Sequence, residues 1–318
     1  MDVATDDNRY KWCMRLMAKS NTSALRKEFV RHKTYKPPEY TYEFCKKNEA
    51  KNRYDDVICI DSTRVILKER PPDDDYIHAN WMVMPDGQKY ICTQGPIQET
   101  ITDFWHMIYT EKSTVIVMLC AFKEGKNEKC ALYHPKTKSE CGKYGQYRVF
   151  LKENKANPYK AVKHTVLSVR RDRKYAIEVN HLSCSEWPDH TAPLDPGPIV
   201  GMMKLARLLC RGNPITVHCS AGIGRSATFV GIDCAMQRIK EDQNTSMVDI
   251  LKELRNQRFQ SVQGIIQYIF LHICVLEGFA DEGIIDRKGK FAQYMADYTR
   301  MLTIFNRRVA AKMKSAEK

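Results

Sequence analysis

Long hydrophobic runs are missing from this 318-residue sequence. Its longest apolar stretch near the expected strands, Val115 to Cys120, is far shorter than the roughly 20 residues that a membrane-spanning helix needs. The acidic N-terminus, residues 1–7, has no apolar segment of the kind found in signal peptides. Internal repeats and low-complexity segments are also missing. We therefore expect one large globular domain, or two small ones, with no export signal and no membrane span.

Paired cysteine spacings of the Cys-x2-Cys type are absent, although the chain has 12 cysteines. The cysteines are scattered, and a disulfide framework fits poorly with a long chain that lacks an export signal. We therefore expect free thiols in a reducing, cytoplasmic compartment.

The formal charge of +13 comes from lysines and arginines that are spread along the chain. Nucleic acid and a membrane surface are alternative partners for such a charge. No module that interleaves aromatic and basic residues is visible, however, so we expect no nucleic-acid partner. A positive field also suits a phosphate-bearing substrate with acidic flanks, and we favour this interpretation.

One stretch combines a strand, a glycine-bearing loop and the start of a helix. The β-branched run from Ile215 to Val217 predicts a short buried strand, and residues 227–240 carry a helical pattern without a breaker. The first N–H groups of a helix have no partner within it, and the helix dipole places partial positive charge there. Gly222 and Gly224 let the backbone curl so that its N–H groups point at one anion. The stretch is therefore a predicted anion site.

Cys219 opens this loop and Arg225 closes it, with five residues between them. A thiol that faces N–H donors, a helix N-terminus and a guanidinium is expected to ionise readily, and a thiolate is a nucleophile. The planar fork of Arg225 matches two oxygens of a phosphate. A buried structural cysteine beside a chance arginine is the alternative, because Cys-x5-Arg alone is a weak pattern.

The full string around these residues is more specific. From His218 to Ser226 it is His-Cys-Ser-Ala-Gly-Ile-Gly-Arg-Ser, and it resembles throughout the signature of the tyrosine-specific protein phosphatase family. The resemblance covers roughly residues 25–280 through five motifs in the family's order. It implies that the Cys219 thiolate attacks phosphorus, that Arg225 binds the phosphate, and that no metal or other cofactor is needed. It also implies that Ser226 donates a hydrogen bond to the leaving sulfur and that His218 supports the loop from behind. The loop residues assigned to substrate binding are Ser220, Ala221, Gly222, Ile223 and Gly224.

Residues 51–57, Lys-Asn-Arg-Tyr-Asp-Asp-Val, suggest by themselves a charged, solvated turn. They are also similar to the family's phosphotyrosine-recognition loop. The resemblance implies that the Tyr54 ring stacks on the substrate ring and that Asp56 accepts a hydrogen bond from a substrate backbone N–H. A tyrosine at the rim makes a deep slot, which rejects the shorter phosphoserine. Tyr54 therefore disfavours a dual-specificity or lipid phosphatase.

The string Trp-Pro-Asp at residues 187–189 resembles the family's mobile acid loop. The resemblance implies that Asp189 contacts the substrate and is the general acid, and that Trp187 acts as a hinge plug. The family usually has Gly and a small apolar residue where Thr191 and Ala192 stand in this chain. We expect the missing glycine to slow or bias loop closure without removing the acid.

Two further segments supply residues through the same resemblance. Glu124 matches the residue that buttresses Arg225, and Lys129 is taken with it as a supporting residue. Gln263 and Gln267 match the family's glutamine loop at the substrate. Gln263 would position the attacking water and Gln267 would assist, whereas a polar helix cap is the alternative interpretation.

Two other positions depart from the family's usual residues. His78 stands where Asn is usual, which is a mild departure, and His134 stands where Trp is usual. We expect His134 to alter local packing without touching the chemistry.

Buried and alternating apolar patterns predict the remaining elements. Strands are expected at residues 115–119, 147–151, 161–170 and 175–182, and helices at residues 25–32, 199–209 and 248–256. With the resemblance, they imply an α/β fold: a twisted mixed central β-sheet flanked by helices on both sides. We expect a helical N-terminal extension at 1–24, the catalytic domain at 25–280, and a basic amphipathic helical tail at 281–318. The tail is expected to fold back on the domain, with contact to a membrane or a partner as the alternative.

The sequence therefore predicts a cytoplasmic protein-tyrosine phosphatase that acts on phosphotyrosine-containing proteins in tyrosine-phosphorylation signalling. A phosphotyrosine-binding pseudophosphatase is the alternative function. The complete set of catalytic residues favours the enzyme, whereas the departures in the acid loop keep the alternative open.

Overall fold

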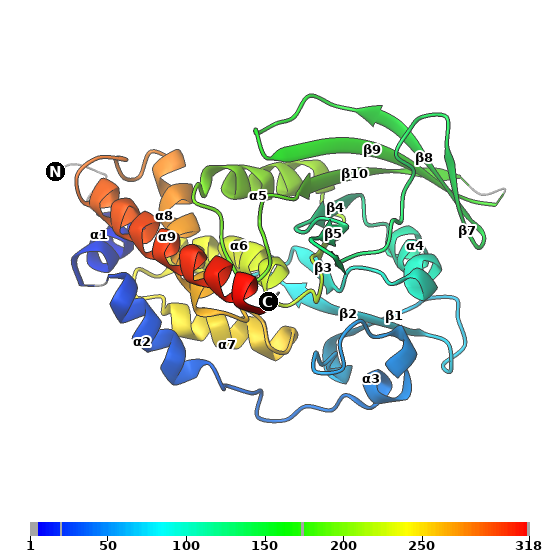
Figure 1. Ribbon diagram of the computed structural model, residues 1–318, viewed down its shortest axis with the longest axis horizontal. Coiled ribbons are helices and arrows are strands. Elements are labelled where there is room, and N and C mark those ends of the chain that lie inside the picture. The colour runs from blue at the N-terminus through cyan, green and yellow to red at the C-terminus, as the bar shows by residue number, and fades with distance from the viewer. Residues whose placement is uncertain (1–5, 20, 173–174, 317–318) are drawn as a thin grey trace.

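The computed structural model describes residues 6–19, 21–172 and 175–316 (Figure 1). Its helices are α1 (Asn8–Lys19), α2 (Thr22–His32), α3 (Glu43–Lys47), α4 (Ile101–Thr110), α5 (Gly197–Cys210), α6 (Arg225–Glu241), α7 (Met247–Gln257), α8 (Ile265–Asp281) and α9 (Lys290–Ala316). Its strands are β1 (Arg64–Ile66), β2 (Tyr76–Val83), β3 (Lys89–Thr93), β4 (Val115–Met118), β5 (Lys123–Glu124), β6 (Asn127–Glu128), β7 (Cys141–Tyr144), β8 (Tyr147–Asn154), β9 (Val162–Arg171), β10 (Ala176–Cys184) and β11 (Ile215–His218).

A mixed sheet of nine strands forms the centre of the described structure, in the order β1-β2-β3-β11-β4-β10-β9-β8-β7. The four middle strands, from β3 to β10, run parallel to one another, and the outer strands pair antiparallel. Strands β11 and β4 are buried at every residue, as is usual for parallel strands that are covered on both faces. The carboxyl end of β11 therefore lies at the middle of the sheet, where ligands of open α/β sheets bind.

Helices cover the sheet on both sides (Figure 1). Helices α5 and α6 pack against the parallel strands, and α4 lies on the other side, next to β7 and β8. Helix α8 is buried at every residue from Ile266 to Leu276. It is the centre of a helical layer, because α1, α2, α5, α6 and α9 all contact it. The fold class expected from the sequence is confirmed.

The two end regions of the chain pack against this helical layer. Trp12 and Cys13 of α1 join the hydrophobic core, and so do Phe291, Tyr298 and Leu302 of α9. The tail helix thus folds back on the domain, while the limits at residues 24 and 280 stay predictions, as does membrane contact by the tail. Residues 1–5 and 317–318 of these regions lie outside the described residues.

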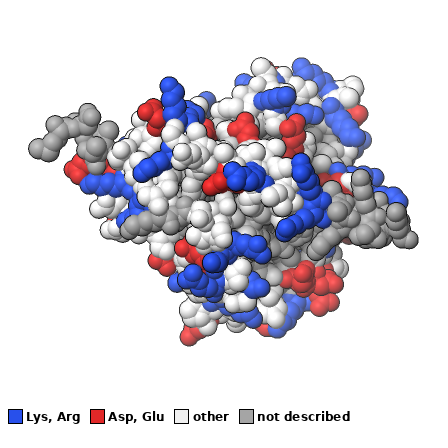
Figure 2. All heavy atoms as spheres, turned by 60° about the vertical axis from the view of Figure 1, so that its left-hand side comes forward, with Lys and Arg blue, Asp and Glu red and all other residues white. Residues whose placement is uncertain are grey.

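The visible surface carries mixed charge, and the thiols are free. On the face in Figure 2, basic side chains are scattered with acidic ones among them. All 12 cysteines are free thiols, and all except Cys141 are buried. Within the described ranges, no helix combines the length and the apolar character that crossing a membrane requires.

Candidate active site

The loop between β11 and α6 forms the centre of the site. Gly222 lies in the left-handed region with a φ of 73°, and a Cβ there would come within 2.2 Å of the Thr93 carbonyl oxygen. Only glycine fits this position, because any side chain would meet both backbone strain and a backbone atom. The Gly222 N–H donates to Sγ of Cys219 at 3.2 Å. The thiol is thus held inside the loop, and Cys219 is only 2% exposed.

A buried hydrogen-bonded chain holds the start of the loop. His181 Nε2 donates to the Tyr133 hydroxyl at 2.6 Å, and this hydroxyl donates to His218 Nε2 at 2.8 Å. His218 Nδ1 then donates to the carbonyl oxygen of Cys219 at 3.1 Å. Burial lowers the pKa of His218 to about 4, so the ring is neutral and can accept and donate in this order. Sequence analysis predicted the support from His218 but missed Tyr133.

A second buried support, Arg258, was missed as well. Its guanidinium donates to the carbonyl oxygens of Ala221 and Gly222, each at 3.1 Å. In a trans peptide the N–H points away from the carbonyl, so these bonds turn the next two N–H groups toward the inside of the loop. On its other edge, Arg258 donates to Asn80 at 2.7 Å and to His78 Nδ1 at 3.2 Å. The signal for Arg258 was its position just before the glutamine segment.

Arg225 is completely buried at the first position of α6. Its Nη1 donates to Glu124 Oε1 at 2.6 Å and to the carbonyl oxygen of Trp187 at 2.7 Å. Its Nε and Nη2 are buried and have no hydrogen-bond partner in the part of the chain that the structure describes. Burial opposes the charge, but nearby Cys219 and Asp189 raise the pKa of Arg225 above its ordinary value. Two donors without a hydrogen bond on a buried cation form a receptor for two oxygens of an anion.

The Asp189 carboxylate lies against the same guanidinium. Its Oδ1 is 3.4 Å from Nη2 of Arg225, and its Oδ2 accepts a hydrogen bond from Nζ of Lys129 at 2.9 Å. The backbone N–H of Asp189 donates to Glu124 Oε2 at 3.3 Å. Burial disfavours the carboxylate, but Arg225 and Lys129 together lower the pKa of Asp189 below its ordinary value. The structure therefore brings these four predicted residues into one contact group.

The segment of residues 187–191, which carries the predicted acid Asp189 and is called the acid segment here, is held together by internal hydrogen bonds. The buried Trp187 donates through Nε1 to the carbonyl oxygen of Thr191 at 2.8 Å, and the Thr191 hydroxyl donates to the carbonyl oxygen of Pro188 at 2.7 Å. The residue with a positive φ is His190, at 56°, and not Thr191. Thr191 is thus accommodated where the family usually has glycine. Its effect on loop closure stays a prediction.

The recognition segment predicted at residues 51–57 lies beside the loop between β11 and α6. The Tyr54 hydroxyl is 2.8 Å from Oγ of Ser220, and Arg53 anchors the segment by donating to the carbonyl oxygen of Gly95 at 3.0 Å. The Asp56 side chain is exposed, so it is free to face a ligand. The Tyr54 side chain is half-buried.

The two glutamines take different positions. Gln267 is buried, and its amide lies where a Cβ on Gly224 would come within 2.7 Å of Nε2. Gln263 is exposed, in a hollow that it shares with Tyr35 and Arg255. Three buried groups near the loop, Gln267 Nε2, Ser226 Oγ and the donors of Arg225, have no hydrogen-bond partner among the described residues. Nor does the described part of the chain contain any cluster of three or more His, Cys, Asp or Glu side chains that could hold a metal.

The family model for protein-tyrosine phosphatase matches residues 48–277. The chain belongs to the protein-tyrosine phosphatase family. It is 34% identical over 235 residues to human receptor-type tyrosine-protein phosphatase C, covering 72% of this chain and 18% of that protein. It is 35% identical over 263 residues to the Lar-like tyrosine-protein phosphatase of Caenorhabditis elegans, covering 81% of this chain and 12% of that protein.

Two further comparisons agree with this assignment. Human tyrosine-protein phosphatase non-receptor type 9 is 34% identical over 260 residues, covering 75% of this chain and 43% of that protein. A solved structure described as the structural basis of the PTPN18 fingerprint on distinct HER2 tyrosine phosphorylation sites aligns with a TM-score of 0.73 at 28% identity. The alignment covers 86% of this chain and all of the other. The chain thus spans a small part of its longer relatives and the full length of a solved phosphatase chain.

Proposed function

We propose that this chain hydrolyses phosphotyrosine in proteins through a phosphocysteine intermediate. The observation that carries the proposal is the pair of buried donors on Arg225 that make no hydrogen bond to any described residue, at the end of the loop that holds Sγ of Cys219. A phosphate bound by these donors would place its phosphorus next to the sulfur.

Binding of the substrate also prepares the acid. In this structure Arg225 and Lys129 favour the charged form of Asp189. A phosphate dianion on Arg225 adds negative charge beside this carboxylate, which raises the pKa of Asp189 and favours its protonated form. The Cys219 thiolate then attacks phosphorus while the bond to the phenolic oxygen breaks, and Asp189 gives its proton to that oxygen.

Hydrolysis of the phosphocysteine reverses the roles. Gln263 positions a water molecule, Asp189 takes its proton, and the water oxygen forms a bond to phosphorus as the phosphorus–sulfur bond breaks. Sulfur leaves as a thiolate, and the free hydroxyl of Ser226 donates a hydrogen bond to it. The backbone donors and Arg225 stabilise the charge of the transferring phosphoryl group throughout. Phosphotyrosine-containing proteins of tyrosine-phosphorylation signalling are the proposed substrates, because Tyr54 lies beside the Cys219 loop, where its ring can stack on an aromatic ring.

The test compares three variants on a phosphotyrosine peptide. Cys219→Ser should bind the peptide without forming a covalent intermediate. Asp189→Ala should lower kcat by about 10²–10⁴-fold with KM similar or lower, because general acid catalysis contributes about that much. Glu186→Ala, which removes an exposed carboxylate three residues away, is the matched control and should keep activity. Tight peptide binding by the unaltered protein with no turnover would identify a pseudophosphatase instead.

A further inference from the structure

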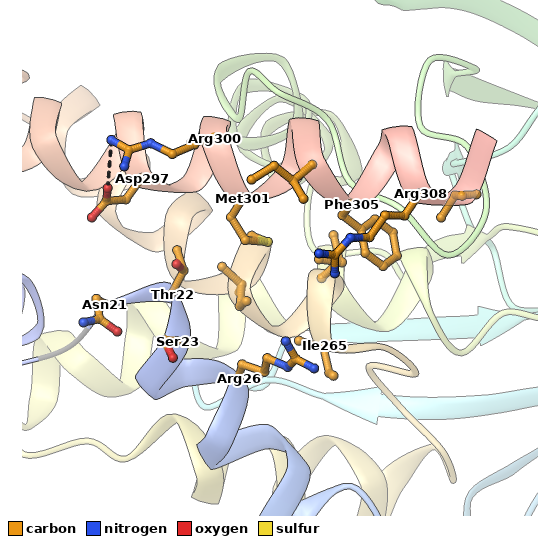
Figure 3. Close-up of a pocket in the computed structure, with 14 residues that line it drawn as sticks. Asn21, Thr22, Ser23, Arg26, Ile265, Asp297, Arg300, Met301, Phe305 and Arg308 are labelled. Atoms are coloured by element: carbon orange, nitrogen blue, oxygen red, sulfur yellow. Dashed lines mark ion pairs between the residues drawn. The ribbon is translucent and has the colours of Figure 1, made fainter. Parts of the chain in front are cut away.

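A groove runs between α2 and α9, over the first turns of α8, and has a volume of about 620 Å³. Figure 3 shows its walls: Thr22, Ser23 and Arg26 come from α2, and Met301, Phe305 and Arg308 come from α9. Both wall helices lie outside residues 48–277, the range that the family model matches. The walls of the groove therefore come from segments that flank the matched range, and α8, within that range, contributes the remaining lining.

Helix α9 has two apolar faces, of which one is fully buried in the core and the other is only partly covered by it. Phe291, Tyr298 and Leu302 are buried. The other face consists of Met301, Ile304, Phe305 and Val309, which line the groove. Met301 and Phe305 pack partly against the core, whereas Ile304 is 44% exposed, so this second stripe is partly open to water. The spacing 301, 304, 305 and 309 is that of one side of a helix.

Two cationic side chains face this apolar lining. The guanidinium groups of Arg26 and Arg308 point into the space between α2 and α9, near Ile265 (Figure 3). Neither forms an ion pair with any residue that the structure describes. At the other end of the groove, Arg300 is 3.6 Å from Asp297, which is the single carboxylate among the described lining residues. The lining is thus apolar with an excess of positive charge.

We propose that this groove is a docking site for an acidic amphipathic helix of a partner protein. Its volume is too large for a single small anion and suits several side chains. An apolar stripe at helical spacing is the usual receptor for the apolar face of another helix. The unpaired Arg26 and Arg308 select carboxylates at the edges of that helix.

The shape favours a peptide over a bilayer. A planar membrane contacts convex surfaces, whereas the apolar side chains here line a hollow between two helices. A bound helix can enter the hollow, cover the partly exposed Ile304 and keep its own outer face in water. Helix α8 begins at Ile265, two residues after Gln263, so a docked partner is held beside the glutamine segment of the active site. The proposal does not depend on the activity proposed above.

The test uses a fluorescein-labelled helical peptide of about four turns, with leucines at i, i+3, i+4 and i+7 and glutamates elsewhere. Fluorescence anisotropy measures its binding to the full chain. A peptide with the same leucines and with lysines in place of the glutamates is the control. We expect the acidic peptide to bind and the basic peptide not to bind.

Matched variants locate the site. Arg308→Glu should weaken binding about tenfold or more, because it removes charge-assisted hydrogen bonds and adds repulsion. Arg307→Glu makes the same change on the neighbouring exposed residue, which does not line the groove, and should have little effect. Ile304→Glu should abolish binding, whereas Leu208→Glu, at a site that is 74% exposed on α5, should not. Thermal unfolding checks that every variant is folded.

Three results would overturn the proposal. The first is no binding of the acidic peptide. The second is equal weakening by Arg307→Glu and Arg308→Glu, which would indicate general charge attraction. The third is binding of the chain to phosphatidylserine vesicles that is lost in Ile304→Glu and Arg308→Glu while the peptide fails to bind, which would assign the surface to a membrane.

Discussion

The Tyr298 hydroxyl donates a hydrogen bond to the carbonyl oxygen of Pro193 at 2.6 Å. This contact joins α9 to the segment that carries Asp189. The Tyr298 ring also stacks on Phe270 with a centroid distance of 6.1 Å, and Phe270 meets Trp187 edge-on at 5.0 Å. A helix beyond the matched family range therefore supports both sides of the acid segment.

Loss of the Tyr298 hydroxyl should weaken the fold and the placement of the acid segment. In Tyr298→Phe the Pro193 carbonyl loses its partner, so we expect the free energy of unfolding to fall by about 1 kcal/mol and kcat on a phosphotyrosine peptide to fall with KM little changed. Tyr294→Phe is the matched control, because the buried Tyr294 hydroxyl has no partner within the described residues and its removal should be neutral or stabilising. Urea unfolding and steady-state kinetics measure both effects. Similar losses in the two variants would contradict the role of this hydrogen bond.

The contact between Lys129 and Asp189 should set the pH dependence of activity. A general acid works only when protonated, so kcat/KM falls as the pH rises through the pKa of Asp189. Lys129 is one of the cations that lower this pKa. Lys129→Met should therefore move the falling limb of the pH profile to higher pH. Lys126→Met removes an exposed charge from the same hairpin and should leave the limb in place. A limb that stays fixed, or moves to lower pH, in Lys129→Met would refute this assignment.

Much of the site could be predicted because it is local in the sequence. A strand, a glycine loop and a helix start are adjacent along the chain, so their order alone indicates an anion site around Cys219. The contact of Glu124 with Arg225 followed from the family resemblance, which named Lys129 only as a supporting residue. These residues occupy one contact group in the structure.

The rest could not be predicted because it depends on long-range pairing. Strand β2 has no counterpart among the sequence predictions, since its buried residues include the polar His78 and Asn80, which hide the apolar pattern. Their partners come from distant segments: Asn80 donates to the carbonyl oxygen of Ile60 and accepts from Arg258. Only the folded chain shows that these polar groups are satisfied. The groove between α2 and α9 also forms between segments that are far apart in the sequence, so the sequence alone does not predict it.

We expect the buried His78 to lower the free energy of unfolding as the pH falls below neutrality. Its Nε2 donates to the carbonyl oxygen of Val57 at 3.0 Å, and its Nδ1 accepts from Arg258. Burial and, to a smaller extent, the Arg258 cation lower the pKa of His78 to about 3, whereas an unfolded histidine has a pKa of about 6.5. Between these values the unfolded chain binds the extra proton, so stability falls as the pH falls, by up to about 1.4 kcal/mol per pH unit.

Replacement by asparagine, the residue usual at this position in the family, removes the titrating group. We expect His78→Asn to lose less stability than the unaltered protein between neutral pH and pH of about 5. Urea unfolding at both pH values measures the difference, and the buried His218 contributes equally to both proteins. Equal losses on acidification would show that His78 does not titrate in this way.

We expect Gly222 to tolerate no side chain for two reasons, its left-handed backbone and the nearby Thr93 backbone. Gly87 separates these reasons, because only the first applies to it. Gly222 and Gly87 both have positive φ, at 73° and 85°, but a Cβ at Gly87 would meet nothing within 4 Å. Gly87→Ala should therefore show the cost of left-handed strain alone, on the order of 1 kcal/mol. Gly222→Ala adds a collision with the Thr93 backbone, so the loop must shift and its N–H donors lose their aim at the phosphate. Loss of one such donor typically lowers kcat by about 10²–10³-fold, and we expect at least that loss on a phosphotyrosine peptide for Gly222→Ala, with near-normal kcat for Gly87→Ala. The free energy of unfolding and the kcat of both variants test this comparison. If Gly222→Ala keeps its kcat, the close packing of the loop against Thr93 does not orient the N–H donors.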